Sequence, residues 1–214
     1  RYRIKVGQRK ENNMGMDVYG SNPKIHKGTN KPDRPEDLHK GASRVVIDKY
    51  FKQSQEFENN NPGVYFRNNC WWWRPLAYFI TAHCDWLTTE QKESLQNNSG
   101  FEFSEHEALS IADTLQKKVQ DGSAAEREEV NKREMAVAEE WNKGINAQQD
   151  ELGEIAKKET GNKNIVPYDY PADLKKKWDD LQKSEDRKAH YPFAERNIKE
   201  FIVFLRECGG FQVC

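Results

Sequence analysis

Apolar side chains recur every three or four positions through most of the chain, which is the spacing of one face of an α-helix. Clusters of proline, glycine and polar residues separate the stretches that show this pattern. The pattern predicts helices over residues 36–58, 105–121 and 123–158, and two more that begin near Pro171 and Pro192. The protein is therefore predicted to be mainly α.

Two of these helices carry further signals. The first has one apolar stripe, formed by Val46, Tyr50, Phe51, Ser54 and Phe57. The second is preceded by a capping box, in which the Ser104 hydroxyl accepts from the Glu107 amide while the Glu107 carboxylate accepts from the Ser104 amide. The stripe indicates an amphipathic helix, and the capping box indicates where the second helix begins.

Short strands are predicted near both ends of the sequence. Gly15–Gly20 alternates weakly between apolar and polar residues and has glycine at each end. Phe101–Phe103 has the same alternation, and Phe211–Cys214 follows the helix-ending pair Gly209–Gly210. Pairing of Met16–Tyr19 with the last strand predicts an α+β fold, in which a helical body is joined to a small antiparallel sheet of N- and C-terminal segments.

The 123–158 helix is long, highly charged and only narrowly apolar. Its stripe consists of Val130, Val137, Trp141, Ile145, Leu152 and Ile155, interrupted by Glu134 and Gln148. A stripe this narrow is typical of a helical hairpin or a projecting arm. We therefore expect a basic N-terminal extension (1–13), one compact domain (14–122 with 165–214) and a charged helical excursion (123–164).

Three consecutive tryptophans, Trp71–Trp73, form the most unusual segment. Successive helical residues point about 100° apart, so these rings cover more than half of a helix's circumference. They either pass through the core or line a pocket. Pro75 either kinks one helix that runs from 65 to 88 or begins a helix at 75, and the restriction that proline places on Arg74 favours a break.

Composition narrows the classes of function. The formal net charge of −1 gives no overall attraction to nucleic acid or to an anionic membrane. Residues 1–13 carry five basic residues against one acidic residue, whereas residues 126–159 carry ten acidic against six basic. No apolar run reaches the roughly 18 residues of a membrane span.

Signatures of catalysis, metals and cofactors do not occur in the sequence. The four cysteines, Cys70, Cys84, Cys208 and Cys214, match no zinc spacing, and reduced, buried thiols in an intracellular protein are expected. No glycine-rich phosphate loop or nucleophile motif is present. The run His83–Asp85 places a thiol between an imidazole and a carboxylate, but neighbours on a helix do not face one another. A protein without metal or cofactor is predicted, and catalysis is disfavoured.

A candidate ligand site lies in the aromatic segment. If residues 65–74 are helical, Arg67, Trp71 and Arg74 share one face. Two guanidinium groups beside an indole can hold a phosphate while a ring stacks on the tryptophan. Asn68 and Asn69 add amide groups that can recognise a ligand edge.

The same residues also fit a structural role. An arginine stacked on tryptophan and paired with a buried carboxylate completes many aromatic cores, and Asp17 is the carboxylate we expect. The asparagines can cap turns instead of binding a ligand. The sequence leaves both interpretations open.

Three stretches together carry a family resemblance: Met14–Gly20, Asn61–Leu76 and Phe204–Phe211. The chain resembles a group of hypothetical proteins encoded by tailed bacteriophages, over about residues 14–120 and the final 20 or so. The resemblance implies a phage accessory protein made in the cytoplasm of a bacterial host. It supplies no catalytic residue and no established function.

Two functions are therefore expected. The first is non-catalytic binding that inhibits or sequesters a host component. The alternative is an enzyme or sensor acting on a nucleotide or other phosphate-bearing small molecule through the Arg/Trp pocket. Nucleic-acid binding through residues 1–13 and the aromatic side chains is disfavoured by the near-zero net charge. No membrane association is expected, and the sequence does not indicate an oligomeric state.

Overall fold

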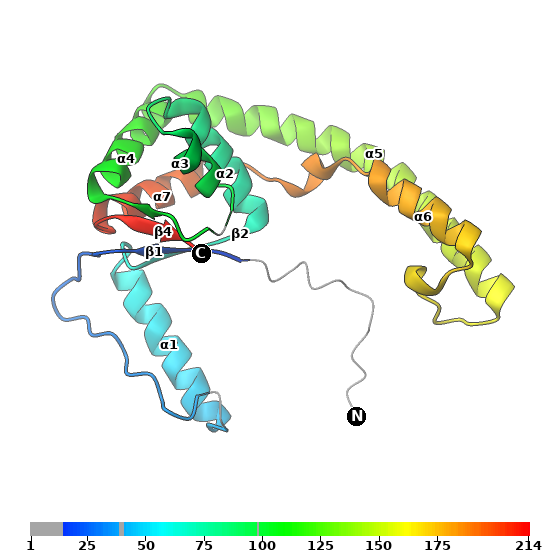
Figure 1. The fold of residues 1–214 in the computed structure, drawn as a ribbon, viewed down its shortest axis with the longest axis horizontal. Coiled ribbons are helices and arrows are strands. Elements are labelled where there is room, and N and C mark those ends of the chain that lie inside the picture. Colours follow the sequence, from blue (N-terminus) through cyan, green and yellow to red (C-terminus); the bar gives the residue numbers. More distant parts are fainter. Residues whose placement is uncertain (1–14, 39–40, 98) are drawn as a thin grey trace. The chain divides into compact units, whose positions relative to one another are not determined.

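A computed structural model describes residues 15–38, 41–97 and 99–214, so the basic extension 1–13 lies outside the described residues. The described part contains seven α-helices and one four-stranded sheet (Figure 1). The helices are α1 (Arg44–Asn60), α2 (Cys70–His83), α3 (Thr89–Ser94), α4 (Glu105–Gln120), α5 (Ser123–Thr160), α6 (Ala172–Ser184) and α7 (Glu195–Glu207). The strands are β1 (Gly15–Gly20), β2 (Tyr65–Asn69), β3 (Glu102–Phe103) and β4 (Phe211–Val213). The predicted mainly α fold with a small sheet is confirmed.

The described chain divides into two units. One consists of 15–126 with 194–214, and the other of 127–193. Residues 165–193 thus group with the charged excursion, whereas the sequence placed them in the compact domain. The reason is packing, because Leu174 of α6 shares a small apolar core with Leu152 and Ala156 of α5.

The sheet joins the two ends of the described chain. Its strand order is β2-β1-β4-β3, and all three pairs are antiparallel. Val18 of β1 lies opposite Val213 of β4, which confirms the predicted pairing of the terminal segments. Figure 1 shows α2, α4 and α7 on one side of this sheet and α1 leaving from the other.

Aromatic rings fill the space between the sheet and its helices. Phe103 and Phe211 stack with centroids 4.5 Å apart, and Phe201 meets the edge of Trp73 at 5.5 Å. Trp73 is fully buried and donates its indole N–H to the Leu95 carbonyl at 2.7 Å. Trp73, the last residue of the tryptophan run, is therefore a core residue, while Trp71 and Trp72 remain half-buried.

The aromatic segment differs from its predicted layout in two ways. Residues 65–69 form strand β2, and the helix begins at Cys70 and continues through Pro75. The expected break before Pro75 is therefore wrong. Proline near the start of a helix removes one backbone hydrogen bond, and burial of Trp73 and Leu76 on the same helix offsets that loss.

The 127–193 unit depends on buried asparagines. The Asn142 side chain donates to the Asp186 carbonyl at 3.0 Å and accepts from the Asp186 amide at 2.9 Å. Asn131 binds the Tyr191 carbonyl and the Phe193 amide in the same manner. These amides hold the segment after α6 along α5, so the buried face of α5 is partly polar.

That arrangement overturns part of the predicted α5 stripe. Val137 and Trp141 are 71% and 60% exposed, whereas Ile145 and Leu152 are buried as expected. Ala138 is fully buried beside them. The contact face of α5 includes the buried Asn131 and Asn142, so it lies to one side of the stripe that hydrophobicity alone indicated.

Three glycines allow backbone segments to cross closely in the other unit. A Cβ on Gly20 would lie within 3.0 Å of the Gly63 carbonyl, and one on Gly63 within 3.0 Å of the Glu207 carbonyl. A Cβ on Gly209, whose φ is +59°, would meet the Asn22 carbonyl as closely. We call Gly20, Gly63 and Gly209 the glycine junction; it brings together the three motifs that carried the family resemblance.

Candidate binding surface

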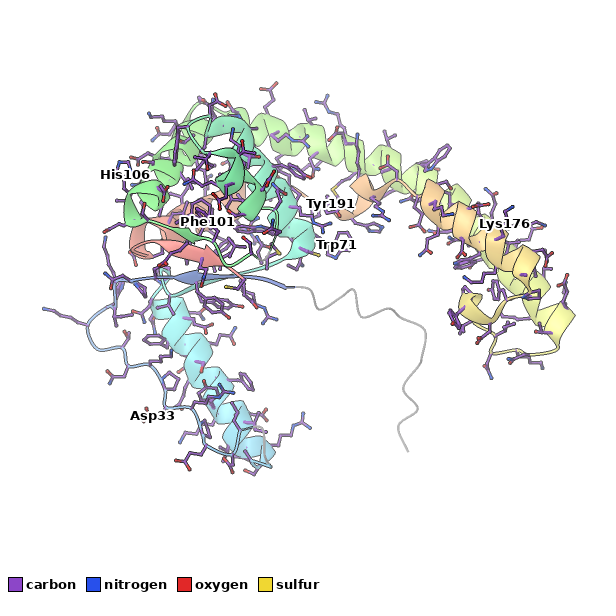
Figure 2. The ribbon with its side chains drawn as sticks, viewed as in Figure 1. Asp33, Trp71, Phe101, His106, Lys176 and Tyr191 are labelled. Atoms are coloured by element: carbon purple, nitrogen blue, oxygen red, sulfur yellow. The ribbon has the colours of Figure 1, made fainter. Side chains whose placement is uncertain are left out.

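The predicted ligand residues do not assemble into one helical face. Arg67 lies on β2 and is exposed, whereas Trp71 and Arg74 lie half-buried on α2. Figure 2 shows Trp71 at the start of that helix. The condition for the Arg/Trp clamp, a helix through residues 65–74, is not met.

The two asparagines of the motif have structural partners. Asn68 is buried and donates to the Asn197 side chain at 3.0 Å. Asn69 is the N-cap of α2, because its side-chain oxygen accepts from the Trp72 amide at 3.0 Å. The capping interpretation that the sequence left open therefore describes Asn69.

Asp17 belongs to a polar aromatic cluster on the face of the sheet away from α7. The Tyr65 hydroxyl donates a short hydrogen bond to Asp17, and the Tyr19 ring stacks on Tyr65 at 5.1 Å. Arg67 is the cross-strand neighbour of Asp17 in the β1–β2 register. We call Asp17, Tyr19, Tyr65 and Arg67 the outer sheet face.

Ionisation equilibria on this face are shifted. Partial burial raises the pKa of Tyr65, and the hydrogen bond to Asp17 raises it further. Burial also raises the pKa of Tyr19, again with a contribution from the Asp17 charge. Glu58, near the end of α1, has a pKa raised by burial although the charges of Arg67 and Lys31 oppose the shift. Clusters of shifted groups are common at functional sites, although structural networks produce them too.

Helix α1 presents apolar side chains to solvent. Val46 and Phe51 are 41% and 57% exposed, and the Tyr50 ring meets Phe51 edge-on at 5.6 Å. Ile47, one helical turn before Tyr50 and Phe51, is half-buried. We call Val46, Ile47, Tyr50 and Phe51 the α1 apolar stripe. Phe57, at the end of the helix, is the buried residue of α1.

A loop runs beside the last turns of α1 and is fixed at its base. The fully buried Asn61 accepts from the His26 amide at 2.8 Å and donates to the Phe57 carbonyl at 2.7 Å. A cavity of about 540 Å³ separates residues 28–33 of this loop from α1, and its lining is mostly polar. Figure 2 shows Asp33 in this loop.

The His83–Asp85 run does not form a catalytic pair. The His83 ring contacts Phe79 at 4.3 Å, and its Nδ1 lies 2.9 Å from the Phe79 carbonyl. Cys84 is fully buried, and burial raises the pKa of its thiol to about 11. A thiol so protonated is a poor nucleophile at neutral pH.

Within residues 15–38, 41–97 and 99–214, no group of three or more His, Cys, Asp or Glu side chains is placed to hold a metal ion. No helix in that same part of the chain is long and apolar enough to cross a membrane. None of the family models, curated proteins or solved structures compared with this chain matches it.

Proposed function

We propose that this protein is a non-catalytic binding protein that engages a host protein through the α1 apolar stripe and the outer sheet face. The resemblance to tailed-phage proteins supports a bacterial cell as the setting. In that setting, binding inhibits or sequesters the host component.

The observation that carries the proposal is the solvent exposure of α1. The helix has 17 residues, and protein helices owe most of their stability to packing of an apolar face rather than to intrinsic propensity. Its first turn has no acidic residue and its last turn no basic residue, so side-chain charges do not complement the helix dipole. Because Val46 and Phe51 are 41% and 57% exposed, complete coverage by a partner contributes about 1 kcal/mol for each, roughly half the value for a fully exposed side chain.

The outer sheet face adds the residue types that dominate protein interfaces. Tyrosine and arginine are enriched among the residues that contribute most to binding. Tyr65 is held by Asp17 and by the stack with Tyr19, so little rotamer freedom is lost when a partner covers it. Arg67 is exposed beside them and is available to a carboxylate on the partner.

The phosphate-clamp alternative has less support. It required Arg67 and Arg74 on one helical face, and these residues lie on a strand and on a helix. The apolar exposure of α1 favours a protein partner instead.

The proposal is tested by placing a photo-crosslinking amino acid at Phe51 and, as a control, at Tyr168, which is 83% exposed on the other unit. Expression in bacterial cells followed by irradiation should give a discrete crosslinked host protein from position 51 and none from position 168. With that host protein purified, Phe51→Ser should weaken binding at least about tenfold.

Val45→Ser is the matched control, because Val45 is 76% exposed on the same helix but outside the α1 apolar stripe. It should leave affinity within about twofold of the original. Crosslinks from position 51 that reach only a second copy of this chain would count against a host partner. Equal binding by the Phe51→Ser and Val45→Ser variants would count against the stripe.

A further inference from the structure

A second concave surface lies between α2 and α3, away from α1 in the sequence. Its volume is about 750 Å³. Tyr78 and Thr81 contribute one helical face of α2, and Thr89 and Lys92 contribute one face of α3. Because residues three apart lie on the same side of a helix, the two short faces form opposite walls.

One residue that lines this cleft, Gln96, contributes a buried side-chain amide nitrogen. The Gln96 side-chain nitrogen is shielded from solvent, and no group in residues 15–38, 41–97 and 99–214 accepts a hydrogen bond from it. Gln96 itself lines the cleft. Buried amide groups are paired in almost all proteins, so a donor in this state points to a bound water or to a ligand oxygen.

Two neighbouring side chains define what such a ligand would carry. Lys92 lines the cleft, is half-buried and forms no ion pair with the carboxylates that the structure describes. Tyr78 also lines it and is 63% exposed, so one side of its ring is open to a planar group. Glu93 lines the cleft as well, and its exposure to solvent screens its repulsion of an anion.

We propose that this cleft binds a small aromatic anion. A carboxylate or phosphate oxygen accepts a hydrogen bond from Gln96 and pairs with the Lys92 ammonium, while the ring of the ligand packs against Tyr78. This site is separate from the α1 apolar stripe and goes beyond protein binding, because it gives the protein a small-molecule ligand.

Titrations monitored by the side-chain amide signals of Gln96 in ¹⁵N-resolved NMR spectra test the site. The probes are benzoate, phenyl phosphate and, as an uncharged ring, benzyl alcohol. Saturable shifts of the Gln96 signals with benzoate, phenyl phosphate or both are expected, with benzyl alcohol at least about tenfold weaker. The stronger anion identifies whether the site prefers carboxylate or phosphate.

Variants separate the contributions. Lys92→Gln should weaken anion binding about tenfold, whereas Glu93→Gln should strengthen it, because each changes one charge beside the ligand. Phe51→Ser, which tests the protein-binding proposal, should leave anion binding unchanged. Gln96 signals that do not move, or equal affinity for the three probes, would overturn the anion site.

Discussion

Substitution of Gly63 by alanine tests whether the glycine junction determines the fold of the larger unit. The new methyl group would lie within 3.0 Å of the Glu207 carbonyl and the Cys208 amide nitrogen. Both are backbone atoms, so no side-chain rotation relieves the clash. The Glu207 carbonyl also accepts from the Lys24 amide at 2.8 Å, and moving it away from Gly63 strains that bond.

The expected loss of stability is about 3 kcal/mol. Overpacking in a close-packed interior costs roughly 1–3 kcal/mol, and loss of one backbone hydrogen bond adds about 1 kcal/mol. Alanine also reduces the entropy of the unfolded chain, which returns about 0.5 kcal/mol because Gly63 does not have a positive φ. For a unit of this size, the melting temperature should fall by about 10 °C.

Gly144→Ala provides a control with the opposite sign. Gly144 lies inside α5, and a Cβ built there meets no atom within 4 Å. Alanine in a helix interior is favoured over glycine by about 0.5–1 kcal/mol, so this variant should be slightly more stable.

Urea unfolding followed by tryptophan fluorescence is the assay. Most of the six tryptophans report on the larger unit, namely Trp71, Trp72, Trp73 and Trp86. A Gly63→Ala protein as stable as the original would refute the close crossing of backbones. Equal losses in both variants would show that the effect is not specific to the junction.

Two further predictions follow from buried and shifted groups. Cys214 is exposed, whereas Cys84 and Cys208 are buried and burial raises the pKa of each thiol to about 11. A thiol reagent at pH 8 should therefore label Cys214 first, and Cys84 and Cys208 only in urea, as read by mass spectrometry. Early labelling of Cys84 would contradict this. Because the pKa of Tyr65 is raised in the folded protein, the unfolded chain loses the Tyr65 hydroxyl proton first as pH rises. The stability that the neutral hydroxyl contributes is therefore intact below pH 10 and is lost above it. The urea midpoint of Tyr65→Phe should therefore fall less between pH 9.5 and about 11.5 than that of the original protein, and identical slopes would show that Tyr65 does not titrate with folding.

Local sequence signals predicted several elements well. The capping box at Ser104 and Glu107 begins α4 as expected, and both reciprocal hydrogen bonds are present. The Gly209–Gly210 pair ends α7, and the strand after it pairs with β1. These signals depend on neighbouring residues, so the sequence contains them directly.

The aromatic segment was harder to predict because its conformation depends on distant residues. The ligand-site hypothesis takes residues 65–69 as part of a helix through residue 74, whereas pairing of β2 with β1 makes them a strand. The role of Asn68 depends on Asn197, which lies far along the chain. Neither partner can be identified from the spacing of residues around the tryptophans.

The sequence alone could not identify the two proposed binding surfaces, for a related reason. The stripe of α1 predicts a buried face, and only the fold shows that Val46 and Phe51 remain uncovered. The α2–α3 cleft needs Tyr78 and Gln96 to come together through a turn that has no ligand-binding motif. Exposure is a property of the whole chain, whereas periodicity is local.

The position of β4 within the sheet determines when the protein can finish folding during synthesis. Phe211–Val213 lies between β1 and β3, so these strands stay apart until the ribosome has released the last of the described residues. Residues 127–193 are continuous in sequence and can reach their own structure earlier. During translation β1 and β3 therefore lack β4, so their hydrogen-bonding edges are open to other chains. Residues 127–193 can already be folded at that stage.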